Sequence, residues 1–182
     1  MAYAVNLLFN SSLANVVSER WTWLADADVS RSMLDLGYPP HVTLAVYDAL
    51  RLDVATAALD RVFENVNQLA VTLTNVTTFG DGSDVVYAAL DSSPDLMLLH
   101  TVVAAAIGEV SRPHYQTNSW TPHCTLATGL DDASLDRAKA VLERDWRPQT
   151  GVFEAATLVE FIPVRGIKRW TLVRPVHSNR TP

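Results

Sequence analysis

The sequence predicts a mixed α and β fold, and three observations support this prediction. Short β-rich runs alternate with amphipathic helical stretches along the whole chain, and no low-complexity linker separates them. The 182 residues, of which 48% are hydrophobic, are enough to bury one sizeable core. A six-residue segment also occurs twice, which suggests two structurally equivalent halves. We therefore expect one domain over residues 1–182, built as two lobes.

The first half of the chain predicts a strand, a helix, a second strand and a second helix. The strand at residues 3–9 is followed by Asn10-Ser11-Ser12, which supplies cap residues for the first helix. A proline pair precedes the second strand at residues 41–47, and a helix is expected over residues 53–69. The predicted buried positions are Leu13, Val16, Val17, Trp21 and Leu24 on the first helix, and Val54, Ala57, Ala58, Val62 and Val66 on the second.

The second half repeats this alternation. Strands at residues 71–76 and 85–90 flank the turn Gly80-Asp81-Gly82. Ser93-Pro94 opens a helix, and Asp131-Asp132 opens another after a strand at residues 123–127. Two final strands are expected at residues 153–162 and 169–173. The predicted buried positions are Leu96, Leu99, Val103, Ile107 and Val110 on the earlier helix, and Leu135, Ala138, Leu142 and Trp146 on the later one.

Composition limits the partners and the compartment. The formal net charge is −6, and affinity for polynucleotide backbone comes mainly from Lys and Arg. We therefore expect a small nucleotide or an RNA terminus as ligand, and no long nucleic acid. The lone cysteine, Cys124, excludes a disulfide framework and fits a reducing cytoplasm. The first residues read as a strand and no apolar run is long enough for a membrane span, so no membrane contact is expected. We also expect a monomer.

The most informative feature is the repeated segment. Pro40-His41-Val42-Thr43-Leu44-Ala45 recurs as Pro122-His123-Cys124-Thr125-Leu126-Ala127, with five of six positions identical and the histidines 82 residues apart. Each copy follows a proline and begins a strand. Because side chains alternate along a strand, the histidine and threonine of each copy project from the same face.

Two imidazoles and two hydroxyls at one site suit phosphoryl transfer. A neutral histidine can deprotonate the attacking water while a protonated one donates to the departing ribose oxygen. Each threonine hydroxyl can donate a hydrogen bond to a non-bridging phosphate oxygen. The sequence therefore predicts His41, Thr43, His123 and Thr125 as catalytic residues that need no metal and no cofactor.

The two motifs resemble the signature of the two-histidine (2H) phosphoesterase superfamily, which is His-x-Thr or His-x-Ser followed by apolar residues, occurring twice. This family includes bacterial 2′-5′ RNA ligase-like proteins and cyclic phosphodiesterases. The resemblance implies an α+β fold of two similar lobes, with small antiparallel sheets, flanking helices and a pseudo-twofold axis through a central cleft. It also implies that His41 is the proton donor and His123 the proton acceptor.

The resemblance implies a metal-independent phosphodiesterase that acts on a 2′,3′-cyclic phosphate or a related cyclic phosphodiester. Two alternatives stay open: cleavage or ligation of a 2′-5′ RNA linkage, and a degenerate module that binds nucleotides without turning them over. Some nucleic-acid-handling members carry a basic residue just after the second motif. Thr128-Gly129-Leu130 stands there in this chain, which argues against binding of long RNA.

Some residues outside the motifs are weaker candidates. Tyr115 and Trp120 precede the second motif, where an aromatic ring can stack on a nucleobase or simply pack in the core. The basic cluster Arg165, Lys168 and Arg169 can attract a phosphate or belong to a solvated turn.

Other residues are not expected to act in catalysis. His100, His114 and His177 lack the repeated context of the two motifs. A zinc site formed by His114 and His123 would lack cysteine or carboxylate ligands nearby. Cys124 is expected to be a small buried hydrophobe rather than a nucleophile.

Overall fold

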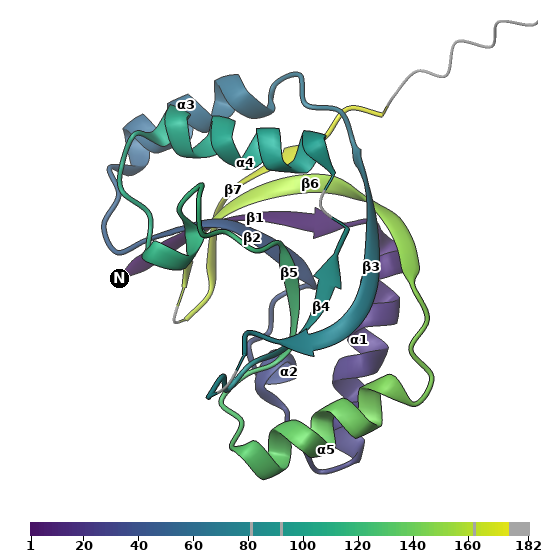
Figure 1. Ribbon diagram of the computed structural model, residues 1–182. Helices are drawn as coiled ribbons and strands as arrows, with labels where there is room; N and C mark the ends of the chain where they lie inside the picture. The colour runs from purple at the N-terminus through teal and green to yellow at the C-terminus, as the bar shows by residue number, and fades with distance from the viewer. Residues whose placement is uncertain (81, 92, 162, 175–182) are drawn as a thin grey trace, which may run out of the picture.

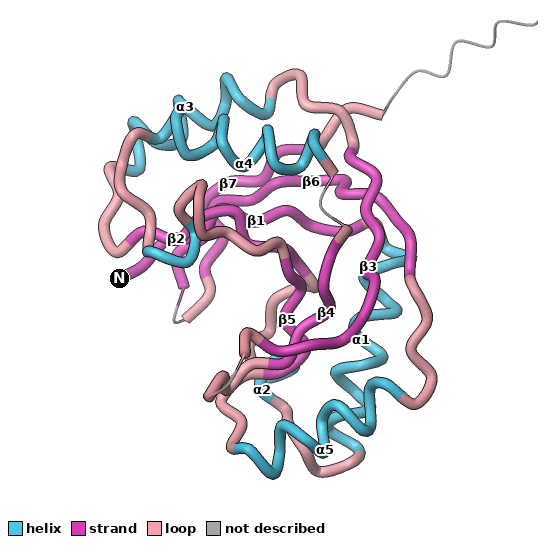
Figure 2. Tube along the Cα trace, viewed as in Figure 1, coloured by secondary structure: helices cyan, strands magenta, loops and turns pink. Residues whose placement is uncertain are grey.

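The computed structural model describes residues 1–80, 82–91, 93–161 and 163–174. Three predictions fall outside these ranges: the turn residue Asp81, the strand end Ile162 and the assignment of His177. The described residues form the expected α+β fold, with an antiparallel seven-stranded sheet and five α-helices (Figures 1 and 2). In chain order the elements are β1 (Ala2–Phe9), α1 (Ser11–Asp26), α2 (Ser32–Asp35), β2 (His41–Tyr47), α3 (Leu52–Phe63), β3 (Leu69–Thr78), β4 (Val86–Leu90), α4 (Pro94–Ile107), the short 3-10 helix η1 (Pro113–Tyr115), β5 (His123–Ala127), α5 (Asp132–Glu143), β6 (Gln149–Phe161) and β7 (Arg165–Thr171).

The order of the strands reflects the sequence repeat. The sheet runs β2-β1-β6-β3-β4-β5, with β7 beside β6. Exchanging β1 with β4, β2 with β5 and β3 with β6 reverses this order and leaves it otherwise unchanged. The exchange matches the 82-residue spacing of the motifs, because each strand in the first half has a counterpart about 80 residues later. The pseudo-twofold relation between the halves is therefore a property of the whole sheet, centred between β6 and β3.

The long strand β6 joins the two halves. Its C-terminal part pairs with β1 on one side and β7 on the other, and its N-terminal part pairs with β3. The two small antiparallel sheets that the resemblance implies are thus the two ends of one curved sheet.

The helices lie on the outer side of this curve (Figure 1). Helices α3 and α4 pack together against the end that carries β2 and β7, while α1 and α5 pack together against the end with β3, β4 and β5. The first helix of each half therefore contacts the motif strand of the other half, α1 on β5 and α4 on β2. Because Val42 and Cys124 are fully buried and their histidine and threonine neighbours are not, we expect the motif histidines and threonines on the opposite, inner face of the sheet.

The helix α3 is shorter than predicted and buries a different face. It ends at Phe63, and β3 already begins at Leu69. Its buried residues are Ala55, Leu59 and Phe63, whereas Val54 is exposed. The Phe63 ring packs with its centroid 5.2 Å from that of Trp170. The larger Leu and Phe side chains therefore determine the buried face, because they remove more apolar surface from water than the alanines of the predicted face.

The predicted helix caps form on α4 and α5 but not on α1. Ser93 and Asp131 cap α4 and α5, accepting hydrogen bonds from the backbone N–H groups of the first turn. Asn10 makes no such side-chain cap on α1; its Oδ1 instead accepts from the N–H of Val152, at 3.1 Å. Val110 lies beyond the end of α4 and is 83% exposed, contrary to prediction. Within the described part of the chain, no helix has the length and apolar character to cross a bilayer.

Candidate active site

The two motifs begin two strands that lie in contact. His41 is the first residue of β2 and His123 the first of β5, and these strands touch across the inner side of the curved sheet. In each motif the histidine and threonine are partly buried, while the residue between them is fully buried. This is the alternation that the sequence predicts. The further expectation, that the four side chains line one open cleft, stays a prediction.

Both imidazoles are held in the same way. Nδ1 of His41 lies 2.8 Å from the carbonyl oxygen of Pro39, and Nδ1 of His123 lies 2.8 Å from that of Thr121. A carbonyl oxygen can only accept, so the Nδ1 atom donates in both cases. In the neutral form of each ring, the lone pair is therefore on Nε2. Each motif thus presents Nε2 for proton transfer.

Burial disfavours protonation of both imidazoles. The pKa of His41 is lowered from 6.5 to about 4, mainly by burial and to a smaller extent by a positive charge on His123, against the opposing effect of the Pro39 carbonyl. Burial likewise lowers the pKa of His123, and its Thr121 hydrogen bond opposes the shift. The two rings are thus close enough for their charges to interact. Double protonation is disfavoured, and an anion between the rings would raise both pKa values.

Both histidines contact aromatic rings. The Tyr38 ring meets His41 edge-on with the ring centroids 4.9 Å apart. His123 contacts Phe79 and Tyr87, with centroid distances of 4.8 and 5.3 Å. Phe79 stacks on Tyr87 and is nevertheless 48% exposed. An exposed aromatic ring beside a candidate catalytic residue is a surface on which a nucleobase can stack.

A buried amide orients the first threonine. Thr43 donates its hydroxyl proton to Oδ1 of Asn6 at 2.8 Å, and Asn6 is only 2% exposed. Rotation of the Asn6 amide by 180° would make Asn6 the donor and release the Thr43 proton toward a phosphate oxygen. Asn6 is therefore a positioning residue for Thr43. Thr125 faces Tyr87 in the equivalent register of the other half.

Two tryptophans donate hydrogen bonds to the backbone of the motif strands. The indole N–H of Trp120 donates to the Thr43 carbonyl at 3.0 Å, and that of Trp21 donates to the Thr125 carbonyl at 3.2 Å. Both indoles are buried. Each motif thus receives the same kind of hydrogen bond at the same position.

The two weaker aromatic candidates take different places. Trp120 stacks on His100, with centroids 4.1 Å apart and the rings nearly parallel. This favours the packing alternative for Trp120 over stacking on a nucleobase. Tyr115 is partly buried, and its carbonyl oxygen lies 3.0 Å from Nε2 of His100. His100 itself is buried, and burial lowers its pKa.

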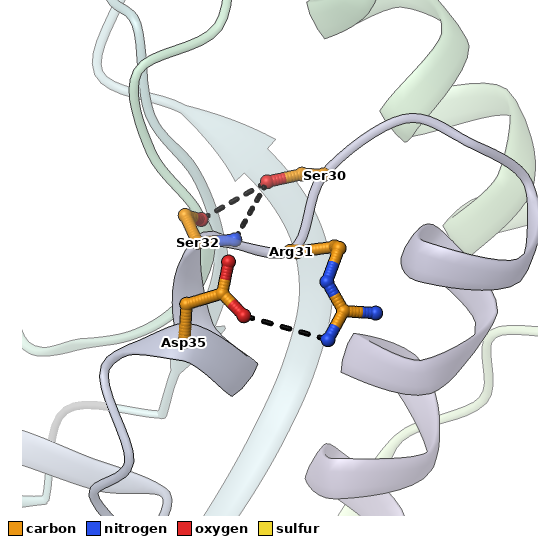
Figure 3. Close-up of polar contacts among 4 residues, drawn as sticks. All are labelled: Ser30, Arg31, Ser32 and Asp35. Carbon is orange, nitrogen blue, oxygen red and sulfur yellow. Dashed lines mark hydrogen bonds and ion pairs between the residues drawn. The ribbon is translucent and has the colours of Figure 1, made fainter.

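The segment before the first motif is tied to the residue after the second. Figure 3 shows Ser30 and Ser32 hydrogen-bonded to each other, and the ion pair of Arg31 with Asp35 at 3.4 Å across one turn of α2. The Ser32 hydroxyl also accepts from the N–H of Thr128, at 3.1 Å. No sequence pattern predicted α2. This short helix links the segment before β2 with the end of β5.

The predicted basic cluster divides between two faces of the sheet. Nζ of Lys168 lies 2.6 Å from Asp60 of α3, while a guanidinium nitrogen of Arg169 lies 3.7 Å from Glu154. Arg165 is exposed at the start of β7. Arg169 borders a pocket of about 380 Å³ beside the first motif. The pocket is lined by Leu8, Tyr38, Pro39, Thr157, Val159, Gly166, Ile167, Lys168 and Arg169.

Cys124 occupies the buried position between His123 and Thr125. The Cys124 thiol is buried, and burial raises its pKa to about 12, with the nearby His41 backbone opposing the shift. A thiolate is therefore disfavoured at neutral pH. In the described ranges, no three His, Cys, Asp or Glu side chains gather where they could hold a metal ion.

Sequence reasoning missed four residues of this site. Asn6 is a polar residue within an apolar strand, and this was a usable signal, because a buried amide needs partners. Tyr38, Phe79 and Tyr87 carry no comparable signal. They come from a loop, a strand end and a neighbouring strand, and only the fold brings them to the histidines.

Comparisons with known proteins bear on the family and the fold of this chain. A model of the 2′-5′ RNA ligase superfamily matches residues 15–162. No curated protein sequence matches the chain. Among solved structures, TT0787 of Thermus thermophilus superposes with a TM-score of 0.65 at 16% identity, covering 94% of this chain and 98% of that one.

LigT of E. coli, solved with 3′-AMP, superposes with a TM-score of 0.62 at 17% identity, covering 93% of this chain and 97% of LigT. LigT has also been solved with ATP and with NADP+, with TM-scores of 0.59 in both cases, at 16% identity. These likenesses show the shared fold. Since the superfamily model covers most of the sequence and both His-x-Thr motifs are present, the chain belongs to the 2′-5′ RNA ligase superfamily of two-histidine phosphoesterases.

Proposed function

We propose that this protein is a metal-independent phosphodiesterase that opens a 2′,3′-cyclic phosphate, or a related cyclic phosphodiester, by acid–base catalysis. The observation that carries the proposal is the matched fixation of His41 and His123. In both rings a backbone carbonyl holds Nδ1 and leaves Nε2 for proton transfer. Paired imidazoles of this kind can supply both the base and the acid of the reaction.

In the proposed reaction, Nε2 of His123 takes a proton from water as the water oxygen forms a bond to phosphorus. Nε2 of His41, protonated in the substrate complex, donates its proton to the ribose oxygen as the P–O bond breaks. The products are a nucleoside monophosphate, a neutral His41 and a protonated His123. Proton exchange with solvent then restores the starting state. Thr43 and Thr125 donate hydrogen bonds to the non-bridging oxygens as charge develops there.

The assignment of His41 as the acid requires that the substrate raise its pKa. A phosphodiester carries a negative charge, which favours the protonated imidazole by Coulomb attraction. The low pKa of the ligand-free His41 then makes its proton easy to transfer once the site is occupied.

The second candidate function is cleavage or joining of a 2′-5′ RNA linkage. The name of the matching superfamily favours this candidate, and the same acid–base pair serves both directions of the reaction. LigT, which shares the fold, has been solved with several small nucleotides. We propose such a nucleotide or an RNA end as the substrate, handled by a monomeric, cytoplasmic, two-lobed single domain.

The test is incubation with the four nucleoside 2′,3′-cyclic monophosphates in EDTA, with product separated by chromatography. Monophosphate is expected. Binding without product would favour the degenerate nucleotide-binding module instead. Loss of turnover on chelation, restored by a divalent ion, would show that the reaction needs a metal. Size-exclusion chromatography with light scattering tests the monomer.

A further inference from the structure

The pocket beside His41 is not used by the chemistry proposed above. Its walls are largely apolar, from Leu8, Val159 and Ile167. On the side of the motif it is bounded by Tyr38, which packs against the His41 ring, and by Pro39, whose carbonyl holds Nδ1 of that ring. A mostly apolar pocket with a few fixed polar groups is typical of small-molecule sites. A ligand in this pocket would contact Tyr38 and Pro39, the two residues that hold the ring of the proposed proton donor.

A row of polar residues crosses the floor of this region. Thr43 pairs with Asn6, Asn6 with Thr157, and Thr157 with Arg169, so the row passes from β2 through β1 and β6 to β7. Residues paired in this way share one face of a sheet. The row therefore connects the first motif with Arg169 on the inner face. The hydroxyl groups of Thr157 and Tyr38 lie 2.6 Å apart at the pocket.

Of the two basic residues among the described lining of the pocket, Arg169 is the more open to a ligand. The other basic residue of the pocket lining, Lys168, is held by Asp60 of α3 at 2.6 Å. The contact of Arg169 with Glu154 is longer, at 3.7 Å, and both side chains are well exposed. Such an exposed pair contributes little energy. A phosphate can therefore displace Glu154 from the Arg169 guanidinium, because the phosphate forms stronger, bidentate hydrogen bonds with that group.

We propose that this pocket binds the nucleoside whose ribose oxygen leaves, and that Arg169 binds a second phosphate on the 5′ side of that nucleoside. The inference rests on the proposed function, since it takes His41 as the donor to the leaving oxygen. Its substrate class is a nucleotide with phosphates on both sides of the ribose, such as an RNA end, in preference to a cyclic mononucleotide. In a chain of net charge −6, a second phosphate needs a local cation of this kind.

The spacing of the strands supports the assignment. Three strand-to-strand steps separate Thr43 from Arg169, which is about 14 Å between their Cα atoms at the usual spacing. The register places Thr43 and Arg169 on the same face of the sheet, at the two ends of this row. A nucleoside with a phosphate at either end can span such an interval together with the Thr43 and Arg169 side chains.

The experiment measures binding of two probes to the full chain by calorimetry. Adenosine 3′-monophosphate carries one phosphate, and adenosine 3′,5′-bisphosphate carries two. We expect the bisphosphate to bind more tightly by roughly 10-fold to 100-fold, the usual effect of a hydrogen bond to a charged group. Arg169→Ala should abolish this preference and leave the affinity for the monophosphate nearly unchanged. The charge-matched control is Arg61→Ala on the exposed side of α3, which should keep the preference.

A second variant tests the pocket itself. Gly166 lines the pocket, its φ lies outside the left-handed region, and an added Cβ would meet no heavy atom within 4 Å. A larger side chain therefore fits at Gly166 without backbone strain, and we expect a bulky one at this position of the lining to obstruct the pocket. Gly166→Trp should weaken binding of both nucleotides at least 10-fold, whereas Gly166→Ala should have little effect. Inorganic phosphate, which needs only the motif residues, should bind alike to all three proteins.

Equal affinity of the wild-type protein for the two probes would overturn the inference. So would a preference that survives Arg169→Ala, or one that Arg61→Ala also removes. Nucleotide binding unaffected by Gly166→Trp would place the nucleoside elsewhere. These readouts do not depend on turnover. If no cyclic nucleotide is hydrolysed, the proposed function fails while the affinity ratio still decides the inference.

Discussion

Each histidine of the site combines a fixed orientation with an unfavourable environment for charge. The backbone hydrogen bonds at Nδ1 set the orientation, and burial lowers the pKa of both rings. The proposed reaction needs one protonated and one neutral imidazole, and we expect this asymmetry to arise only when substrate binds. The negative charge of the phosphodiester then favours one proton between the two rings, and their mutual repulsion disfavours a second.

Acid should destabilise the folded protein in a defined pH window. The pKa of His41 is about 4 in the folded protein and about 6.5 when unfolded. Between these values the unfolded chain binds more protons. The stability that comes from a neutral His41 is therefore present above pH 6.5 and lost as the pH falls toward 4. The loss at His41 is at most about 3 kcal/mol, and less where water reaches the ring.

Urea unfolding at several pH values checks this prediction. His41→Gln should flatten the dependence of the free energy of unfolding on pH between pH 6.5 and 4. Part of that dependence should remain, because burial also lowers the pKa values of His100 and His123. Asp60 and Asp131 have pKa values lowered by hydrogen bonds from Lys168 and Ser134. Their contribution is lost only at pH values below this window. An unchanged slope in His41→Gln would contradict the account.

Ligand binding should shift the His41 titration in the opposite direction. With adenosine 3′-monophosphate bound, the phosphate charge favours the imidazolium, so the pKa of His41 should rise from about 4 by at least one unit. Titration of the imidazole resonances by NMR, with and without the nucleotide, measures the change. His114, which is exposed, is an internal control. A His41 resonance that titrates identically in both samples would show that the phosphate does not lie beside it.

At the scale of elements, the site depends on strands held from both sides. Helices α1 and α4 each pack on the motif strand of the other half, and Trp21 and Trp120 donate hydrogen bonds to the threonine carbonyls of those strands. The sequence was sufficient to predict most of these elements, because strand and helix periodicities and the caps at Ser93 and Asp131 are local signals. The sequence was insufficient to predict which face of α3 is buried or that α2 forms, because long-range packing determines both.

The two tryptophans offer a matched pair of variants. Trp120→Phe keeps most of the ring but leaves the buried Thr43 carbonyl without its donor, and Trp21→Phe does the same at Thr125. Each should lower the free energy of unfolding by about 1–3 kcal/mol. Each should also reduce kcat more than it raises KM, because the threonine moves relative to the phosphate. Thermal unfolding and steady-state kinetics give the two readouts. Full activity in both variants would show that the carbonyl hydrogen bonds do not position the threonines.

At the scale of the whole molecule, the repeated motif predicted more than its own six residues. The 82-residue spacing recurs in the exchange of β2 with β5 and of β1 with β4 about the centre of one sheet. The symmetry was readable from the sequence because the motifs are nearly identical. The continuity of the sheet was not, because it depends on how β6 pairs at its two ends, and nothing local encodes this pairing.

The shared sheet predicts cooperative unfolding of the two halves. β6 pairs with strands of both halves, and each half contributes a helix that packs on the other, so neither half can keep its core alone. Far-UV circular dichroism and tryptophan fluorescence should give coincident unfolding curves in urea. Two separated transitions would indicate that the halves are independent domains.

Kinetics on two substrates can separate the roles that we propose for His41 and His123 on one phosphate. An acid matters chiefly when the leaving group is a poor alkoxide, so a nitrophenyl phosphodiester should hardly need it. His41→Ala should lose roughly 10²-fold to 10⁴-fold in kcat/KM on a nucleoside 2′,3′-cyclic phosphate and largely recover on the nitrophenyl ester. His123→Ala should stay impaired on both. Equal losses in the two variants on both substrates would contradict the assignment, and recovery by His123→Ala alone would reverse the two roles.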